Sequence, residues 1–347
     1  MDSTAGTVGG GDAASRPSPA RGPTMKAVVR DRYGSAEVLD LRDVERPQVG
    51  DDDVLLRVRA AGLDRGAWHI MAGRPYLMRI AGYGLRRPKA AGLGSEVAGV
   101  VEAVGAAVTG FRAGESVFGT CRASFAEYAL ARPDRLARMP ENLTLEQAAA
   151  VPVSAVTALQ ALRDRGRVEA GQRVLVIGAS GGVGTFAVQI AKAFGAQVTG
   201  VCSTPKVDLV RSIGADHVID YSHADITDDD QRYDVVLDIG GNRPLSQLRR
   251  VLTRHGTLVI VGGEGGGRWT GGIDRQLRAM ALSPFVRQRL GTFIANESSA
   301  DLDVLRALIE TGAVTPVIDR VVALQQVPDA IRDLAAGRVR GKIVVAP

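Results

Sequence analysis

The most regular pattern along the chain runs from Arg173 to Phe194, where a block of aliphatic residues gives way to a helical repeat. Val174 to Ile177 are apolar without interruption, which is typical of a strand buried on both faces. A glycine-rich turn follows, and from about Thr185 apolar residues recur at helical spacing until Gly195, where a C-terminal cap is expected. The pattern therefore predicts a buried strand, a tight turn and an amphipathic helix.

Short apolar runs after this helix recur at the spacing expected when strands alternate with helices. They predict strands at Gln197 to Val201, His217 to Ile219, Asp234 to Leu237, Thr257 to Val261 and Gly291 to Ala295. The arginine-rich stretch Ile273 to Leu290, which precedes the last strand, is predicted to be helical. Alternation of this kind is typical of the α/β class, and we predict a doubly wound parallel sheet.

The chain before this region has a different pattern, with short strands at close spacing separated by glycine turns. These strands are expected at Met25 to Val29, Val54 to Val58, Glu96 to Val104, Ser116 to Phe118 and Phe125 to Leu130. Arg65 to Gly73 fits a short helix or a loop, and Thr144 to Arg163 fits two helices broken at Pro152. We therefore expect a small all-β barrel ahead of the α/β region.

The end of the chain returns to strands after the α/β region. Helices are predicted at Asp301 to Ile309 and Pro328 to Ala336, and strands at Val317 to Ala323 and Gly341 to Val345. Strands in this place indicate that the chain comes back to its first domain. We therefore expect one domain from residues 25–150 and 297–347, and a nucleotide-binding domain from residues 151–296.

Composition narrows the class of protein. A chain of 347 residues with 45% hydrophobic and 23% charged residues fits a two-domain globular protein, and no run approaches about eighteen apolar residues. We therefore expect no membrane partner. The first 24 residues are rich in Gly, Ala, Ser and Pro and are predicted to be a disordered tail. Cys121 and Cys202 fit neither a disulfide framework nor a metal site, which predicts free thiols and a cytoplasmic location.

The net charge of +5 raises the question of nucleic-acid binding. Aromatic residues make up only 4% of the chain, and no basic stretch is interleaved with them. Solvated arginine faces are therefore favoured over a nucleic-acid partner.

The glycine-rich turn carries the first candidate chemistry. Ala179-x-Gly181-x-x-Gly184 matches the dinucleotide fingerprint, with alanine at its first place. Gly181 lets the backbone approach a pyrophosphate, Gly184 lets the helix pack closely on the strand, and the first N–H groups of the helix face the anion. The turn therefore predicts a dinucleotide cofactor.

The end of the next strand discriminates between the two nicotinamide dinucleotides. An NAD site usually has an acidic residue there, whereas this chain has Ser203, Thr204 and Lys206. Two hydroxyls and an ammonium suit a 2′-phosphate, which predicts NADPH. The alternative, that Lys206 faces water while Ser203 and Thr204 cap the next helix, stays open.

Several segments together resemble the medium-chain dehydrogenase/reductase superfamily, in its zinc-independent quinone-oxidoreductase and enoyl-reductase branch. The resemblance covers Met25 to Val345, and its matching segments are Met25 to Val29, Gly94 to Val101, Gly114 to Gly119, Ala158 to Leu162, the glycine fingerprint, Ile213 to Tyr221, Asp234 to Gly241, and Gly341 to Val345. It implies a Rossmann domain and a GroES-like β-barrel domain, with a cleft between them for nicotinamide and substrate. It also implies a homodimer formed through the Rossmann sheets.

The same resemblance allows zinc to be tested residue by residue. The three catalytic ligand places of the zinc alcohol dehydrogenases fall at Asp64, at Ser95 within Gly94-Ser95-Glu96, and at about Val153. The structural-zinc lobe should lie beyond Gly119, where this chain has Cys121 alone. A tetrahedral site needs three or four N or S donors. We therefore expect no bound metal, and reduction of an acceptor that is already activated.

The resemblance further assigns residues to the cofactor. It places Thr157 beside the nicotinamide and Tyr221 on the adenosine side. The pyrophosphate is contacted by Gly181, Gly182 and Val183, and the 2′-phosphate by Ser203, Thr204 and Lys206. The remaining groove is lined by Gly240, Gly262, Phe293 and Ile294. Lys342 either reaches the cleft or lies on the surface at the start of a strand.

The catalytic candidates are Asp64, His69, Tyr76 and Tyr83, which accompany Trp68 in the cleft segment. Asp64 orients either the substrate or the nicotinamide ribose. His69 has a side chain that titrates near neutral pH and could relay a proton, although packing within an apolar helix remains an alternative. Tyr76 and Tyr83 can each donate a hydrogen bond to an enolate. Solvent delivery of the proton remains open as well.

The loop from Gly262 to Gly272 is unusually rich in glycine and holds Trp269, which predicts a lid or an interface element, with a plain linker as the alternative. The sequence as a whole predicts an NADPH-dependent, zinc-free oxidoreductase that reduces a small quinone or α,β-unsaturated carbonyl. Two alternatives stay open: an NADP-linked alcohol or aldehyde dehydrogenase without metal, and a nonenzymatic NADPH-binding or RNA-binding protein.

Overall fold

A computed structural model describes residues 22–347, apart from residue 229 and residues 264–266. The predicted N-terminal tail therefore lies almost wholly outside the described residues. Its last residue, Thr24, already belongs to the first strand, so the folded chain begins slightly earlier than predicted.

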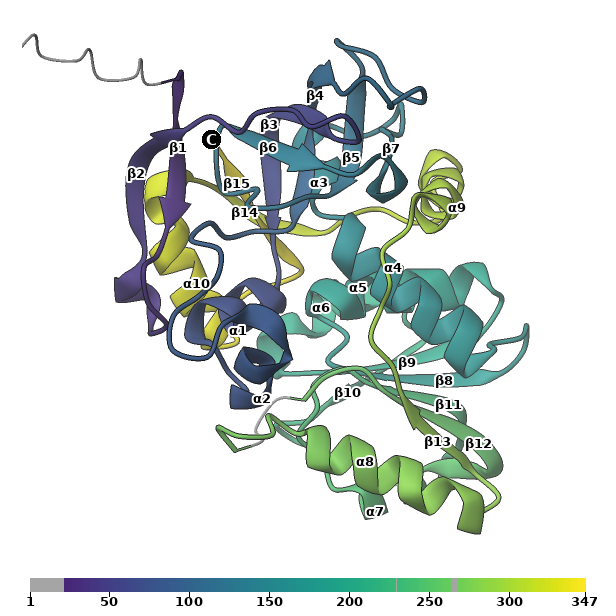
Figure 1. Cartoon of the computed structure of the whole chain (residues 1–347). Helices are drawn as coiled ribbons and strands as arrows, with labels where there is room; N and C mark the ends of the chain where they lie inside the picture. Colours follow the sequence, from purple (N-terminus) through teal and green to yellow (C-terminus); the bar gives the residue numbers. More distant parts are fainter. Residues whose placement is uncertain (1–21, 229, 264–266) are drawn as a thin grey trace, which may run out of the picture.

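The α/β region contains a six-stranded parallel sheet in the order β10-β9-β8-β11-β12-β13 (Figure 1). Its strands are β8 (Arg173–Ile177), β9 (Gln197–Cys202), β10 (His217–Asp220), β11 (Tyr233–Asp238), β12 (Leu252–Ile260) and β13 (Arg289–Thr292). Chain order reverses between β8 and β11, which makes their carboxyl ends the switch point of a doubly wound sheet. The predicted fold class is confirmed.

Helices cover both faces of this sheet. In Figure 1, α4 (Pro152–Gln160), α5 (Gly182–Ala193) and α6 (Val207–Ser212) lie above it, whereas α7 (Leu245–Arg250) and α8 (Ile273–Leu282) lie below. Val174 and Val176 of β8 belong to the core under α4 and α5, while Leu175 and Ile177 belong to the core under α7 and α8. The uninterrupted apolar run of β8 therefore reflects burial on both faces.

The other region is built on a mostly antiparallel sheet in the order β14-β15-β3-β4-β5-β7, with β6 also paired to β3. Its strands are β3 (Val54–Leu63), β4 (Glu96–Val104), β5 (Ser116–Thr120), β6 (Tyr128–Ala131), β7 (Leu136–Arg138), β14 (Ile318–Ala323) and β15 (Lys342–Ala346). A separate antiparallel pair is formed by β1 (Thr24–Val29) and β2 (Asp40–Glu45). The end of the chain thus returns to the first sheet.

Four other helices pack around the first sheet or between the two sheets. They are α1 (Arg65–Ala72), the single turn α2 (Tyr76–Met78), α9 (Ser299–Glu310) and α10 (Val327–Ala335). The helix α3 (Leu145–Ala149) precedes Pro152, where α4 begins, as the pattern predicted.

Some predicted boundaries were wrong. The helix α5 begins at Gly182 rather than at about Thr185, because Gly181 is the extended N-cap and two glycines occupy the first turn. The predicted helix Ile273 to Leu290 ends at Leu282, and β13 begins before the predicted start at Gly291. The strands β2 and β7 were not predicted.

Within the described residues, no helix has both the length and the apolar composition needed to cross a membrane. The two cysteines, Cys121 and Cys202, are free thiols, as predicted. Burial raises the pKa of both, that of Cys202 to about 11, so each is protonated at neutral pH.

Candidate active site

The glycine turn between β8 and α5 has the close packing that a phosphate-binding turn needs. A Cβ at Gly184 would overlap the carbonyl oxygen of Gly178, so only glycine lets α5 start this near to the strand. A Cβ at Gly182 would lie 2.9 Å from Cδ of Lys342 and 3.1 Å from Oγ of Ser154. Gly181, by contrast, would meet only the Gly178 carbonyl, at 3.6 Å, which leaves its side of the turn open to a ligand.

The carboxyl ends of β8, β11 and β12 meet at the switch point. The carbonyl of Ile177 accepts from the backbone N–H of Ile239 at 3.1 Å and of Gly240 at 3.2 Å. A Cβ at Gly262 would overlap the carbonyl of Ile239. These glycines therefore form a continuous backbone floor beside the turn, which is where a dinucleotide lies in this class of sheet.

A buried ion pair lies behind the glycine turn. Nζ of Lys342 contacts Oε2 of Glu96, and both side chains are almost wholly enclosed. Oε1 of Glu96 accepts from the backbone N–H of Val153 at 2.9 Å, at the beginning of α4. Burial raises the pKa of Glu96 to about 7, Lys342 opposes that rise, and the charge of Asp64 adds to it.

Lys342 therefore does not lie on the surface, and that alternative was wrong. Its strand is attached to the glycine turn, because the N–H of Gly341 donates to the carbonyl of Ser180 at 2.8 Å. A Cβ at Gly62 would overlap the Glu96 carboxylate, so a glycine in β3 leaves room for the pair. The last strand of the chain thus joins the two sheets directly at the candidate cofactor site.

Asp64 has a clear local role. It is the N-cap of α1, and its Oδ1 accepts from the N–H of Ala67 at 2.8 Å. Its Oδ2 accepts from the hydroxyl of Ser95 at 3.0 Å. The carboxylate is buried, and both of its oxygens have a partner, so it holds the start of α1 against the loop that precedes β4.

His69, Tyr76 and Tyr83 lie in different settings. His69 is half-buried on α1, and its Nδ1 is 2.9 Å from the carbonyl of Arg74, so Nδ1 carries the proton and donates. Tyr76 is half-buried and packs edge-on against Trp269, with 5.3 Å between ring centroids. Tyr83 is exposed on the outer surface. The structure thus brings Asp64 and Ser95 together, and Tyr76 together with the glycine-rich loop.

The described part of the glycine-rich loop contacts the cleft segment directly. The carbonyl of Arg268 accepts from the N–H of Tyr76 at 3.0 Å, and a Cβ at Gly271 would lie 3.0 Å from Pro75. Because this loop follows β12 and Tyr76 follows α1, the contact joins the α/β region to the region that contains the first sheet. Residues 264–266 lie outside the described residues.

The predicted 2′-phosphate residues surround the end of β9. Lys206 donates to the carbonyls of Gly337 and Val339, both at 2.8 Å. Burial lowers the pKa of Lys206, and the positive charge of Arg340 lowers it further. Lys206 therefore lies close to a second cation, with the carboxylate of Asp319 opposing the effect of Arg340 on its pKa.

A carboxylate that the strand pattern missed lies at the same edge. Asp220 ends β10 in register with Cys202, and the Thr204 hydroxyl donates to it, which lowers the Asp220 pKa. Tyr221 follows it with an exposed ring, and its N–H donates to the Cys202 carbonyl at 3.0 Å. Thr204 is therefore engaged by Asp220, whereas Ser203, which precedes the turn, is half-buried.

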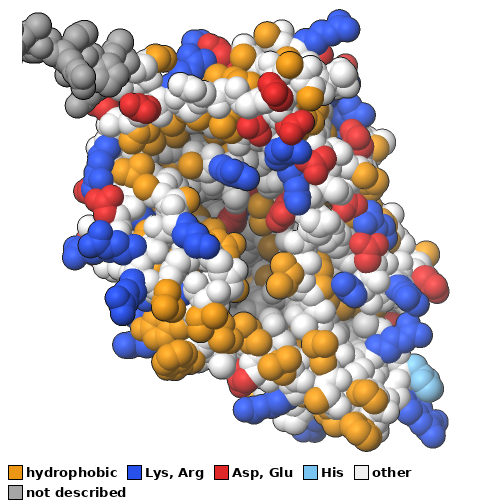
Figure 2. All heavy atoms as spheres, viewed as in Figure 1, with side chains coloured by type: hydrophobic (Ala, Val, Ile, Leu, Met, Phe, Trp, Pro, Cys, Tyr) orange, Lys and Arg blue, Asp and Glu red, His pale blue; other side chains and the backbone are white. Residues whose placement is uncertain are grey.

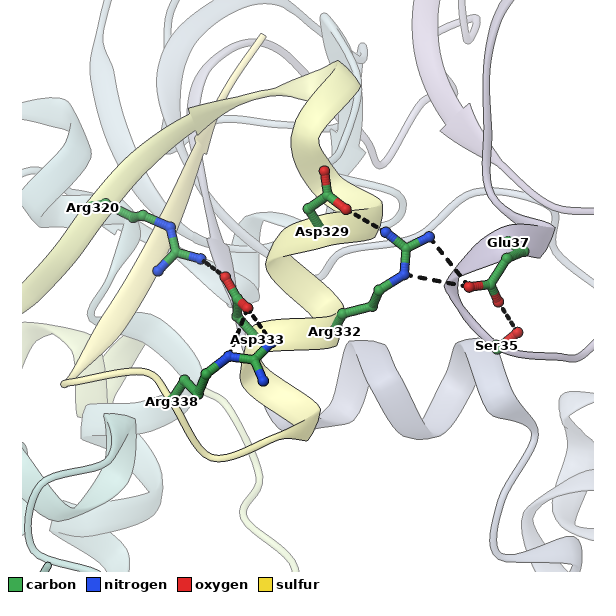
Figure 3. A network of polar contacts seen from close by, with 7 residues as sticks. All are labelled: Ser35, Glu37, Arg320, Asp329, Arg332, Asp333 and Arg338. Carbon is green, nitrogen blue, oxygen red and sulfur yellow. Dashed lines mark hydrogen bonds and ion pairs between the residues drawn. The ribbon is translucent and has the colours of Figure 1, made fainter.

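Ion pairs on both sides of α10 surround the segment after it, whose carbonyls accept from Lys206 (Figure 3). Asp333 contacts Arg320 of β14 and accepts from Arg338 at 2.5 Å, and Arg332 reaches Glu37 at 3.2 Å. The N–H of Arg340 donates to Asp319 at 3.2 Å. The segment facing Lys206 is thus held from behind by β14 and α10.

The remaining predicted cofactor residues are distributed along the groove. Thr157 lies in α4 and donates its hydroxyl to the carbonyl of Val153 at 2.7 Å. Phe293 lies just after β13 and is half-buried, whereas the neighbouring Ile294 is exposed. Ala179 and Val183 belong to the glycine turn and pack on the core beneath α5.

Prediction from sequence missed three further polar groups at the site. These are Ser95, which was considered only as a zinc-ligand place, Glu96, which was assigned no role, and the buried pair of Asp238 with Arg275. Asp238 ends β11, and Arg275 also donates to the Gly262 carbonyl at 3.3 Å, so the pair fixes the floor of the groove to α8. An acidic residue at one end of a mostly apolar strand was the available signal for Glu96 and Asp238.

The three zinc-ligand places hold Asp64, Ser95 and Val153, and the two polar ones bond to each other. Across residues 22–347, outside the four that are not described, there is no group of three or more His, Cys, Asp or Glu side chains that could hold a metal ion.

Comparison with known proteins identifies the family. Residues 50–141 match the alcohol dehydrogenase GroES-like domain, and residues 213–345 match a family described as zinc-binding dehydrogenase. The chain is 32% identical over 332 residues to the quinone oxidoreductase of Homo sapiens, covering 92% of this chain and 97% of that protein. It is also 32% identical over 343 residues to 2-methylene-furan-3-one reductase of Solanum lycopersicum, covering 93% and 79%.

A solved structure, the quinone oxidoreductase from Coxiella burnetii, superimposes with a TM-score of 0.81 at 27% identity and covers 94% of this chain and 100% of that one. The chain therefore belongs to the medium-chain dehydrogenase/reductase superfamily, in its quinone oxidoreductase-like branch, and is an oxidoreductase that uses a nicotinamide cofactor.

Proposed function

We propose that this protein reduces quinones or α,β-unsaturated carbonyls with NADPH and without zinc. The observation that carries the proposal is the pairing of Asp64 with Ser95 in place of metal ligands, opposite a glycine turn shaped for a pyrophosphate. Without a Lewis acid an alcohol keeps its high pKa, whereas an enone or a quinone accepts a hydride directly. The names of the relatives from Homo sapiens and Solanum lycopersicum agree with this substrate class.

When bound, the cofactor supplies the hydride. The chain aligns the nicotinamide with the acceptor and stabilises the negative charge that develops on the acceptor. The N-terminal amides of α5 would hold the pyrophosphate, and Thr157 would lie beside the nicotinamide. Asp64 and Ser95 hold α1, which carries His69, against the cleft. Because His69 uses its Nδ1–H on the Arg74 carbonyl, we assign the Tyr76 hydroxyl as the donor to the acceptor oxygen on which negative charge develops.

The choice of NADPH rests on Lys206 and Arg340. The positive charge of Arg340 acts on Lys206, the carboxylate of Asp319 offsets part of that repulsion, and a doubly charged phosphate would offset the rest. Asp220 would favour NADH instead, because a carboxylate at this edge can accept a hydrogen bond from a ribose 2′-hydroxyl. Since Thr204 and the N–H of Ser222 already donate to Asp220, we assign the 2′-phosphate to the two cations.

Stopped-flow oxidation of NADPH by a panel of quinones, enones and aliphatic aldehydes tests the reaction. We expect turnover with quinones or enones that is unchanged by a chelator, and no stoichiometric zinc by metal analysis. Activity confined to simple alcohols and aldehydes favours a metal-free alcohol dehydrogenase instead. One equivalent of zinc per chain, with activity lost on chelation, contradicts the proposal.

We also assign the protein to the cytoplasm and to a homodimer. The cytoplasmic assignment rests on the two free thiols, which suit a reducing compartment. The dimer rests on β13, which is an edge strand of the parallel sheet with two exposed apolar residues near its ends, Phe285 and Ile294.

A further inference from the structure

A patch of large apolar side chains lies on the surface beside the cleft mouth. Ile80 and Leu85 are each 67% exposed and Trp269 is 66% exposed, with Leu77 and Tyr83 also exposed near them. We call these five residues the mouth patch. Figure 2 shows hydrophobic side chains gathered on this side of the central hollow, over the position of α2 in Figure 1.

The mouth patch is continuous across the two regions of the chain. Leu77, Ile80, Tyr83 and Leu85 belong to α2 and the segment after it, whereas Trp269 belongs to the glycine-rich loop. The edge-on contact of Trp269 with Tyr76 joins the two parts. Exposed apolar side chains that gather in this way are unusual on a monomer unless they contact another surface.

The α2 side of the mouth patch lies in a segment that has only positive charges. From Arg65 to Ser95 the sequence has no Asp or Glu, and it has six cations, which are Arg65, Arg74, Arg79, Arg86, Arg87 and Lys89. Arg86, Arg87 and Lys89 are exposed. The nearby carboxylate of Asp31, which faces Arg87, is already paired with Arg42 at 2.7 Å.

We propose that the mouth patch docks on an anionic lipid bilayer. Aliphatic tips with an interfacial tryptophan and tyrosine suit the boundary between headgroups and acyl chains, and the flanking cations suit anionic headgroups. A nucleic acid would match the cations but leave Ile80 and Leu85 in water. Docking of this kind turns the cleft mouth toward the lipid, so that an acceptor with a long apolar chain enters without crossing water.

This proposal concerns the surface and does not depend on which acceptor is reduced. The expectation that the chain has no membrane partner came from the absence of a long apolar run, which bears on spanning and not on surface binding.

Flotation of the full chain with phosphatidylcholine vesicles, with and without phosphatidylglycerol, tests the docking. We expect binding to the anionic vesicles that weakens about thirtyfold in Arg86→Ala/Lys89→Ala, because two surface cations are lost. Ile80→Asp/Leu85→Asp should abolish it. Val304→Asp is the matched control, since Val304 is 42% exposed on α9, away from α2 in Figure 1. NADPH binding, measured on every variant, verifies the fold.

A tryptophan reporter separates docking by this face from other contacts. The chain has two tryptophans, so Trp68→Phe leaves Trp269 as the only one. We expect its emission to shift to the blue on anionic vesicles and to be quenched by lipids labelled in the acyl chain. Equal binding to neutral vesicles, binding unchanged in Ile80→Asp/Leu85→Asp, or self-association through this patch without lipid each overturns the proposal.

Discussion

Glu96 is a carboxyl group enclosed on all sides, with Lys342 as its counter-ion. Its native pKa of about 7 is above the ordinary value of 4.5, so between these values the native state keeps a proton that the unfolded chain has released. The free energy of unfolding therefore falls as the pH rises through this window, by about 1.4 kcal/mol per pH unit from this group alone.

Urea unfolding across that window checks this expectation. Glu96→Gln should remove that part of the slope, and above about pH 7 it should also be less stable than the wild type, because Lys342 is then left buried without an anion. Glu141→Gln, at an exposed residue, is the control and should keep the wild-type slope. The same slope in wild type and Glu96→Gln would contradict the assignment.

At the edge of the cofactor groove, Lys206 and Arg340 should determine the preference for NADPH. We expect Lys206→Asp to raise the Kd for NADPH by about a hundredfold, since it replaces an attraction by a repulsion, with little change for NADH. Arg340→Ala should lower the preference by about tenfold, while Arg306→Ala on α9 leaves it unchanged. Fluorescence titration with both nucleotides measures the ratio of the Kd for NADH to the Kd for NADPH. If this ratio is unchanged in Lys206→Asp, the 2′-phosphate binds elsewhere.

The turn into α5 is the element on which binding depends most. Gly184→Ala inserts a Cβ that overlaps the Gly178 carbonyl, so the start of the helix must move away from β8. We expect at least about tenfold weaker NADPH binding and a loss of about 1–3 kcal/mol of stability. Gly110→Ala is the control, because nothing lies within 4 Å of its Cβ position. Equal affinity in both variants would show that close packing of this turn is not needed.

Elements with a strong local pattern were predictable from the sequence. The strand β4 matches its predicted range, and β8 to β11 were found within two residues, because an apolar run between turn residues leaves little choice. The strand β3 continues five residues past Val58, where it is buried on both faces and the alternation disappears. The stretch after Ile273 was predicted to be one helix, although Pro284 lies inside it and a 3-10 turn separates α8 from β13.

The polar groups of the site were less predictable, because their partners are distant in sequence. Glu96 and Lys342 are 246 residues apart, and nothing near either one indicates the other. Asp220 was missed because the acidic residue of a nucleotide site is expected at the end of β9. In this chain the carboxylate lies at the end of the neighbouring strand, β10. Lys206 was correctly placed at the end of β9, but its contacts with the segment before β15 required the fold.

For the whole molecule, the edge strand β13 predicts association of two chains through their parallel sheets. Ile294 is 95% exposed and Phe285 is 84% exposed beside this edge. We expect wild-type protein to sediment as a dimer and Ile294→Asp/Phe285→Asp to sediment as a monomer that still binds NADPH. A wild-type monomer, or a dimer that the double substitution leaves intact, contradicts this arrangement.

The central claim is that the glycine turn between β8 and α5, with Lys206 at its side, binds NADPH for transfer of a hydride to an acceptor. Isothermal titration calorimetry of the purified chain with NADPH and then with NADH tests it most directly. The account predicts one site per chain, tighter binding of NADPH than of NADH, and loss of that difference in Lys206→Asp. Absence of measurable binding of either nucleotide to the folded wild-type protein would contradict it.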